Sequence, residues 1–168
     1  KSAGADAALL VTPYYNRPTQ EGLYRHYCSV ADEVDLPQIL YNVPSRTGCD
    51  LLTETVMKLV SHQNILGLKD ATGDLSRLEE IIAKLKLIKD QEFKLYSGDD
   101  PTATQFMLNG GSGTISVTAN VVPSLIAEIC DKALSGEKKI AIKLDSDLKA
   151  LNEILFVESN PIPVKWIL

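Results

Sequence analysis

The chain of 168 residues has no apolar run that approaches the length of a membrane-spanning helix, and no signal peptide is recognised in its first residues. It also lacks an excess of positive charge, because 17 Lys and Arg stand against 22 Asp and Glu, for a formal net charge of −5. No basic stripe is visible along the chain. These absences argue against a membrane and against nucleic acid as partners.

Cysteine and histidine are also scarce. Three cysteines, Cys28, Cys49 and Cys130, are odd in number and lack the spacing of a metal site or a redox motif. This pattern predicts a reducing compartment, which we take to be the cytoplasm. The two histidines, His26 and His62, have no Cys, Asp or Glu clustered at ligand spacing, so we predict no metal site.

What is present is an ordinary globular composition, with 45% hydrophobic and 23% charged residues, enough for one domain with a core. Short strand-like runs alternate with amphipathic stretches. The predicted strands cover residues 7–13, 38–43, 65–69, 93–97 and 114–118. The predicted helices cover residues 74–87 and 137–156, with further helix starts at Asp100-Pro101, at Pro123 and near residues 164–168.

Alternation of strands and helices predicts an α/β fold with parallel strands joined by right-handed crossovers. Two architectures fit this pattern, an open doubly wound sheet and a TIM (β/α)8 barrel. A complete barrel takes about 250 residues, or about 31 for each unit, so this chain has room for about five units. If the barrel is correct, we expect the chain to be a fragment of one.

A lysine, Lys69, ends the third apolar run and is followed by a polar turn, Asp70-Ala71-Thr72-Gly73. Its stem is expected in a core and its amine at the rim, where desolvation disfavours the ammonium form and lowers the pKa. A neutral amine can attack a ketone and form a Schiff base. Considered alone, however, Lys69 fits an ion-paired lysine at a strand end better than a nucleophile.

The other strand ends are polar as well, and in barrels the active site lies at the carboxyl ends of the strands. Polar loops are common in any fold, which explains Asn, Ser, Asp and Gly at these positions but explains paired tyrosines and a lysine less well. The glycine cluster at residues 109–113 closes a helix and opens a strand, the reverse of a dinucleotide fingerprint. We therefore predict no nucleotide and no other cofactor.

Three segments together resemble the dihydrodipicolinate synthase family of pyruvate-dependent class I aldolases, a superfamily that includes N-acetylneuraminate lyase. The segments are Val11-Thr12-Pro13-Tyr14-Tyr15-Asn16-Arg17-Pro18, Tyr41-Asn42-Val43-Pro44-Ser45-Arg46-Thr47-Gly48 and Gly67-Leu68-Lys69-Asp70-Ala71-Thr72-Gly73. Residues 97–100 and 113–120 extend the resemblance over essentially the whole chain. It implies a partial TIM barrel, strands four to eight, with five β/α units in residues 1–136 and the start of a C-terminal helical region in residues 137–168.

The resemblance also implies an activity. Lys69 would form a Schiff base with pyruvate, and the resulting enamine would attack aspartate 4-semialdehyde to give 4-hydroxy-tetrahydrodipicolinate, in lysine and diaminopimelate biosynthesis. Tyr41 would relay protons, and Tyr15 would be the second relay tyrosine, reaching into the site of a neighbouring subunit. The resemblance thus implies a homo-oligomer, a dimer of dimers, with Tyr14 at the subunit contact.

Substrate contacts follow from the same resemblance. Arg46 would receive the carboxylate of aspartate semialdehyde, because a guanidinium binds a carboxylate through two parallel hydrogen bonds. Gly98 and Asp99 match positions that line the pocket of the second substrate. Ile115 matches the residue that borders bound pyruvate.

The chain also departs from the family. The residue after the lysine is often Glu in the family and is Asp70 here, a change to which we assign no function. The connection across residues 84–92 is a few residues longer than usual. The first three strands of the family have no counterpart, nor does their Thr-Thr pair, one threonine of which completes the proton relay. We therefore expect these residues alone to be inactive.

Two alternatives remain open: another pyruvate aldolase such as N-acetylneuraminate lyase, and a non-catalytic, doubly wound binding module.

Overall fold

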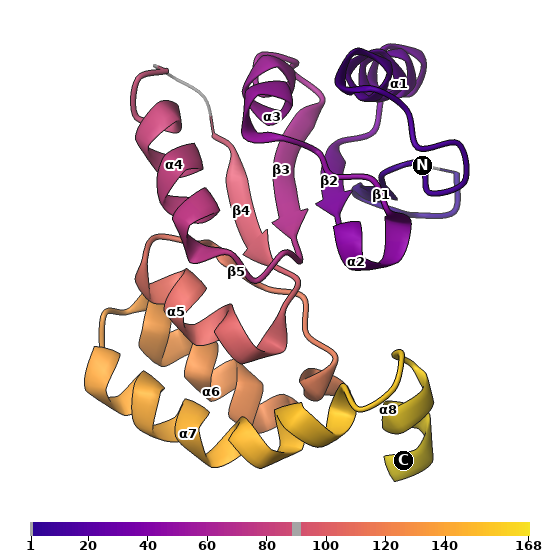
Figure 1. Cartoon of the computed structure of the whole chain (residues 1–168). Coiled ribbons are helices and arrows are strands. Elements are labelled where there is room, and N and C mark those ends of the chain that lie inside the picture. Colours follow the sequence, from indigo (N-terminus) through magenta and orange to yellow (C-terminus); the bar gives the residue numbers. More distant parts are fainter. Residues whose placement is uncertain (1, 89–91) are drawn as a thin grey trace. The chain divides into compact units, whose positions relative to one another are not determined.

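The computed structural model describes residues 2–88 and 92–168 and divides into two compact units, Lys1–Tyr96 and Ser97–Leu168 (Figure 1). Residues 89–91 belong to the connection that we expected to be long, and they lie outside the described residues. None of the helices in the described part of the chain combines the length and the apolar character needed to cross a membrane.

The first unit alternates strands and helices, which confirms the pattern predicted from the sequence. Its strands lie in sheet order β1-β2-β3-β4, and both β1–β2 and β2–β3 pair in parallel. Its elements are β1 (Ala8–Val11), α1 (Gln20–Glu33), β2 (Gln38–Asn42), α2 (Pro44–Thr47), α3 (Thr53–Leu59), β3 (Ile65–Asp70), α4 (Leu75–Leu85) and β4 (Lys94–Ser97).

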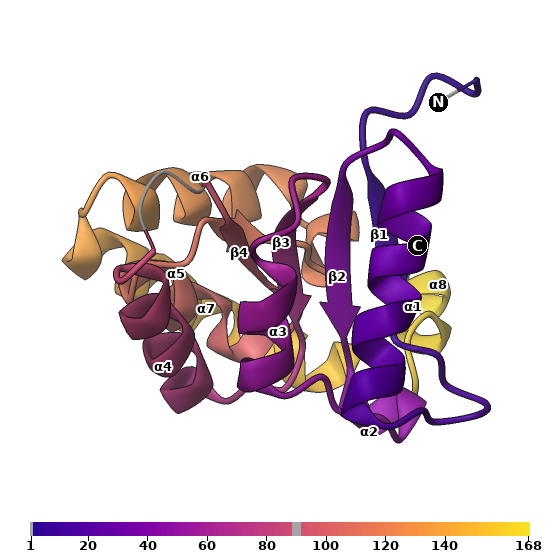
Figure 2. The ribbon, with the colours of Figure 1, turned by 90° about the horizontal axis from the view of Figure 1, so that it is seen from above.

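The two faces of this sheet differ sharply in burial. Helices α1, α3 and α4 lie along one face (Figure 2). The side chains of Leu40 and Leu68, which are partners in the β2–β3 register, are fully buried on that face. Because side chains alternate along a strand, their chain neighbours point to the opposite face. There Leu9 is 43% exposed and Val11 is 37% exposed, so this second face is far more open.

Side-chain caps set where two of the helices beside this sheet, α1 and α4, begin. Asp74 accepts a hydrogen bond from the amide of Ser76 at 2.9 Å, so α4 starts at Leu75, one residue inside the predicted range. In the same way Thr19 accepts from the amide of Gly22 at 3.2 Å and starts α1. The predicted helix at residues 74–87 is therefore confirmed.

The second unit is mainly helical and has its own core. Its core residues come from α5, α6 and α7: Met107, Ile129, Ala133, Ala141 and Leu148. The elements are the 3-10 turn η1 (Asp100–Thr102), α5 (Ala103–Leu108), β5 (Gly113–Thr114), the 3-10 turn η2 (Thr118–Asn120), α6 (Pro123–Leu134), α7 (Lys138–Leu155) and α8 (Ile162–Ile167). The predicted helix at residues 137–156 and the helix start at Pro123 are confirmed.

The helix start predicted at Asp100-Pro101 is confirmed as η1, whereas the strand predicted at residues 114–118 is wrong. The carboxylate of Asp100 accepts hydrogen bonds from the amides of Val117 at 2.8 Å and Thr118 at 3.2 Å. These amides are therefore not available to a strand ladder, and the chain enters η2 at Thr118. The predicted strand at residues 114–118 is thus only the two-residue β5, and the chain from Asp100 begins in a 3-10 turn.

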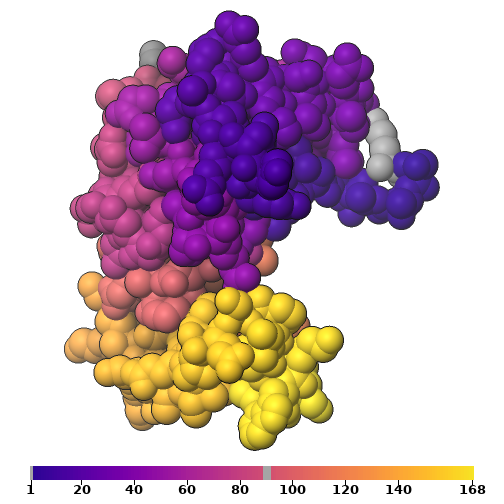
Figure 3. All heavy atoms as spheres, turned by 45° about the vertical axis from the view of Figure 1, so that its right-hand side comes forward, coloured from indigo at the N-terminus to yellow at the C-terminus, as the bar shows by residue number. Residues whose placement is uncertain are grey.

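At the end of the chain, yellow in Figure 3, α8 follows α7. A hollow of about 290 Å³ is lined there mainly by apolar side chains, among them those of Val157, Ile162 and Trp166. Trp166 is 86% exposed, so the predicted helix near residues 164–168 is present but only partly packed within this unit.

We predict that Gly67→Ala weakens the first unit. A Cβ atom at Gly67 would lie 2.6 Å from the carbonyl oxygen of Lys94, so β3 and β4 could accommodate it only by a shift of backbone. The free energy of unfolding should fall by about 1–3 kcal/mol, as for other overpacked sites. Urea denaturation measures this fall. The control is Leu66→Ala in the same strand, at a residue 42% exposed; an equal loss in both variants would contradict the steric explanation.

Candidate functional site

Lys69 and Tyr41 face each other at the carboxyl ends of two adjacent strands. They are partners in the parallel register of β2 and β3, and Val11 of β1 is the partner of Tyr41. The three side chains therefore form one row on the open face of the sheet. The Nζ atom of Lys69 lies 4.2 Å from the centre of the Tyr41 ring. In its charged form, an amine at this distance is attracted by the ring.

The hydroxyl of Tyr41 is affected by its surroundings in two opposing ways. Burial raises the pKa of Tyr41 above the usual value of 10.0, and the nearby charge of Arg46 lowers it in part. The net direction is upward, so Tyr41 holds its proton at neutral pH and can donate a hydrogen bond.

Arg46 lies on the short helix α2, directly after the strand that carries Tyr41. Pro44 starts this helix, and Gly48, with φ 62°, ends it in the left-handed conformation that glycine adopts readily. The amide of Gly48 donates to the carbonyl of Pro44 at 2.8 Å and closes the turn. Arg46 is exposed and within electrostatic range of Tyr41.

The two tyrosines after β1 lie in an exposed turn. Tyr14 is 65% exposed and Tyr15 is 94% exposed, so Tyr15 makes almost no packed contact within the chain. The described structure thus does not bring Tyr15 against Lys69 as it does Tyr41. In the same loop Arg17 has a positive φ of 43°, and its guanidinium lies where a side chain at Gly48 would stand.

The remaining predicted residues, Gly98, Asp99 and Ile115, belong to the second unit and gather around Ser97. The amide of Ile115 donates to the carbonyl of Ser97 at 2.9 Å, and the amide of Asp99 donates to the Ser97 hydroxyl at 3.2 Å. The carboxylate of Asp99 accepts from the hydroxyl of Thr102 at 2.6 Å. Ile115 is 40% exposed, so its side chain is accessible.

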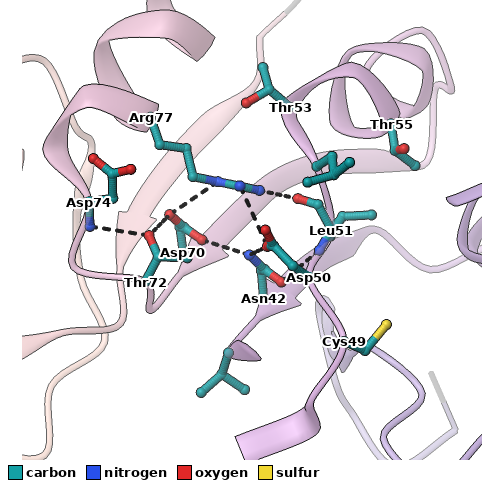
Figure 4. A network of polar contacts seen from close by, with 12 residues as sticks. Asn42, Cys49, Asp50, Leu51, Thr53, Thr55, Asp70, Thr72, Asp74 and Arg77 are labelled. Carbon is teal, nitrogen blue, oxygen red and sulfur yellow. Dashed lines mark hydrogen bonds and ion pairs between the residues drawn. The ribbon is translucent and has the colours of Figure 1, made fainter. Parts of the chain in front are cut away.

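Behind Tyr41 and Lys69, on the helix-covered face, lies a buried polar pair that the sequence analysis missed. Asn42 follows Tyr41, Asp70 follows Lys69, and the two are themselves partners in the register. The side-chain amide of Asn42 donates to Asp70 Oδ1 at 3.1 Å (Figure 4). Asn42 is fully buried and Asp70 is 7% exposed. The detectable signal was their spacing, because a residue next to a site residue in a strand must point to the opposite face.

Arg77, from the first turns of α4, completes this group. Its guanidinium lies 3.5 Å from Asp70 Oδ2 and 3.5 Å from Asp50 Oδ1, and it donates a hydrogen bond to the carbonyl of Leu51 (Figure 4). Burial raises the pKa of Asp70 above 3.8, while the hydroxyl of Thr72 and the charge of Arg77 act in the opposite direction. We call Asn42, Asp50, Asp70 and Arg77 the rear network.

Among the described residues there is no group of three or more His, Cys, Asp or Glu side chains placed to hold a metal ion. His62 pairs instead with Asp32, at 3.0 Å between Nε2 and Oδ1.

A sequence model of the dihydrodipicolinate synthetase family matches residues 1–168, the whole chain. The chain belongs to this family. The resemblance inferred from the three motif segments is therefore confirmed. An open, doubly wound binding module is no longer needed to explain the alternation of strands and helices.

Members of the dihydrodipicolinate synthetase family resemble the chain in both sequence and structure. The 4-hydroxy-tetrahydrodipicolinate synthase of Methylococcus capsulatus is 59% identical over 168 residues, which are 100% of this chain and 56% of that protein. A structure of dihydrodipicolinate synthase from Acinetobacter baumannii, complexed with pyruvate, superposes with a TM-score of 0.94 at 53% identity. The match covers 98% of this chain and 55% of that one.

A more distant family member gives the same result. The dihydrodipicolinate synthase of Aquifex aeolicus is 42% identical, with a TM-score of 0.92 over 98% of this chain and 55% of that one. The chain thus has the α/β fold with parallel strands of these enzymes and spans little more than half their length.

We predict that Arg77→Met destabilises the protein at neutral pH. Removing the guanidinium leaves the Asp70 carboxylate buried without its charge partner, a change that costs roughly 3–5 kcal/mol of unfolding free energy. The loss should shrink as the pH falls through the pKa of Asp70, because a protonated carboxyl needs no counter-charge. Denaturant unfolding at pH 7 and at about pH 4 measures both effects.

Arg25→Met is the matched control for this measurement. Arg25 pairs with Glu21 at 2.7 Å on the exposed face of α1, where its side chain is 77% exposed. Loss of such an exposed pair changes stability by about 0.5 kcal/mol or less. A pH-independent loss in Arg77→Met would contradict the role assigned to the Asp70 charge.

Proposed function

We propose that the protein condenses pyruvate with aspartate 4-semialdehyde through a Schiff base on Lys69, giving 4-hydroxy-tetrahydrodipicolinate for lysine and diaminopimelate biosynthesis. The observation that carries this proposal is the amine of Lys69 at the end of β3, 4.2 Å from the Tyr41 ring, in a chain of the dihydrodipicolinate synthetase family. Its relatives named 4-hydroxy-tetrahydrodipicolinate synthase support this substrate pair.

The proposed reaction begins when the neutral amine of Lys69 attacks the keto carbon of pyruvate and water leaves. The iminium withdraws electrons from the methyl group, so a methyl proton can depart and an enamine forms. The enamine carbon then bonds to the aldehyde carbon of the second substrate, whose oxygen takes up a proton. Finally the amine of that substrate replaces Lys69 at the iminium carbon, which closes the ring and frees the lysine.

Tyr41 is the proposed proton relay for these steps. Its raised pKa keeps the hydroxyl protonated at neutral pH, so it can donate a proton as the carbinolamine loses water and regain one afterwards. Tyr15 is the proposed second relay residue, acting in the site of another subunit. Its exposure of 94% is consistent with a side chain that serves a neighbouring copy.

The other roles concern substrate binding. We assign Arg46 to the carboxylate of aspartate semialdehyde, Gly98 and Asp99 to the pocket of that substrate, and Ile115 to the border of pyruvate. The exposure of Arg46 and Ile115 supports these assignments, because both side chains are accessible.

We further propose that residues 1–136 supply strands four to eight of a TIM barrel, and that residues 137–168 begin a C-terminal helical region. The open face of β1 to β3 supports this, because a barrel buries the face opposite its helices. By the same resemblance, the proposed assembly is a homo-oligomer, a dimer of dimers, in the cytoplasm.

Another pyruvate aldolase of the superfamily, such as N-acetylneuraminate lyase, is the rival function. It would share the Schiff base on Lys69 and differ in the aldehyde. The intact protein should turn over faster with aspartate semialdehyde than with N-acetylmannosamine. The reverse preference would replace our proposal with the rival one.

We predict that borohydride reduction in the presence of pyruvate labels Lys69. Peptide mass mapping of the intact protein should find the reduced pyruvate adduct on this residue and nowhere else in the chain, since imine formation requires a neutral amine. Lys69→Arg should abolish labelling, and Lys58→Arg, at an exposed position on α3, should leave it unchanged. Finding Lys69 unmodified in the wild-type protein would refute the mechanism.

We also predict that Arg46→Ala weakens the binding of aspartate semialdehyde but not the reaction with pyruvate. Loss of a hydrogen bond to a charged group is worth about 1.5–3 kcal/mol, so the KM for aspartate semialdehyde should rise roughly 10- to 100-fold. Formation of the pyruvate adduct should stay close to wild type. Steady-state kinetics and borohydride trapping measure the two effects, with Arg25→Ala as the control; equal loss for both substrates would contradict this role.

A further inference from the structure

We propose that Arg77 is a positioning residue, which holds the strand ends bearing Tyr41 and Lys69 through the buried side chains of Asp70 and Asn42. This inference rests on the proposed function and adds a residue that acts from the helix-covered side of the strands, through Asp70 and Asp50.

The two faces of the strands are coupled through the backbone. Tyr41 is paired with Lys69 in the register, and the next pair along the same strands is Asn42 with Asp70. Each buried residue is joined to a site residue by one peptide bond, so a rotation of Asp70 about the strand axis also moves Lys69. The amide of Ala71 donates to the carbonyl of Asn42 at 2.9 Å and continues the ladder past both pairs.

The side chain of Asn42 is held by three hydrogen bonds. Its amide nitrogen donates to Asp50 Oδ1 at 2.8 Å and to Asp70 Oδ1 at 3.1 Å, and its oxygen accepts from the amide of Leu51 at 2.9 Å. Three partners fix both the position and the flip state of this amide. Asn42 thereby ties the end of β2 to β3 and to the loop before α3.

The positive charge of Arg77 balances the negative charges of Asp50 and Asp70. Asp50 and Asp70 both accept from the one amide of Asn42, which places two carboxylates at the same group. Arg77 brings a positive charge into the rear network, and it reaches both carboxylates at 3.5 Å. Its side chain is 10% exposed and that of Asp70 is 7% exposed, so solvent screens this contact little, whereas Asp50 is 40% exposed and its contact with Arg77 is screened more. Without Arg77, repulsion would drive the carboxylates apart and release Asn42.

Loss of Arg77 is expected to affect catalysis through the placement of Tyr41 and Lys69. Reactions of positioned groups are sensitive to placement, and a displacement of about 1 Å can cost on the order of 100-fold in rate. The rear network sits one residue from both reacting side chains and fixes the segment that carries them. Loss of Arg77 should therefore slow Schiff-base formation even in molecules that stay folded.

The test is the single-turnover rate at which the intact protein forms the borohydride-trapped pyruvate adduct on Lys69, at saturating pyruvate and well below the unfolding temperature. We expect Arg77→Met to lower this rate 10- to 100-fold while circular dichroism shows a folded protein. Arg77→Lys keeps the charge but not the forked geometry, and should recover part of the rate. The control Arg25→Met should match wild type.

A second variant keeps the inference falsifiable if Arg77→Met does not fold. Asp70→Asn preserves the shape of the side chain but removes the charge that Arg77 faces, and we expect its rate to fall severalfold. Wild-type rates in Asp70→Asn, or in a folded Arg77→Met, with only the unfolding temperature lowered, would show a purely structural brace and overturn the inference.

Failure of the proposed function gives a different result. In that case wild-type protein forms no adduct on Lys69. A wild-type adduct whose rate is indifferent to Arg77 and Asp70 leaves the function standing and removes the positioning role.

Discussion

Tyr41 and Lys69 meet because β2 and β3 pair in parallel with a fixed register, and the rest of the site depends on that pairing. A slip of one residue would turn Lys69 toward the helices and bring Asp70 to the open face. The hydrophobic side chains between the sheet and the helices oppose such a slip, since Leu40 and Leu68 would then be exposed. Burial of apolar surface on one face of the sheet thus determines which polar groups appear on the other.

The two faces carry polar groups under different physical conditions. On the open face, Lys69 and Tyr41 are both only partly buried. On the covered face, burial raises the pKa of Asp70, and charge and hydrogen bonds from Arg77, Thr72 and Asn42 work against that rise. A buried charge is tolerated only where such partners surround it. The rear network thus restricts which side chains can stand on the covered face at the strand ends.

The sequence was sufficient for the alternation of strands and helices in the first unit. Apolar periodicity placed α4 and α7 to within two residues, and the resemblance of the motif segments pointed to Lys69 and Tyr41, which the fold brings together at adjacent strand ends. It was insufficient where a distant side chain competes for backbone groups, as when Asp100 takes the amides that a longer β5 would use. It was also insufficient for Asp70, because its partner Asn42 lies 28 residues away in sequence and only the fold brings the two together.

The shared hydrogen bonds of the rear network also limit which amino-acid substitutions the chain can accept during evolution. Asn42 serves two carboxylates and Arg77 faces the same two, so each single substitution leaves a buried group of the set without its partner. An apolar replacement of the whole set could be as stable, but every path to it by single steps passes through a weakened intermediate. Such a set is expected to be inherited as a block, with its members entrenched by one another.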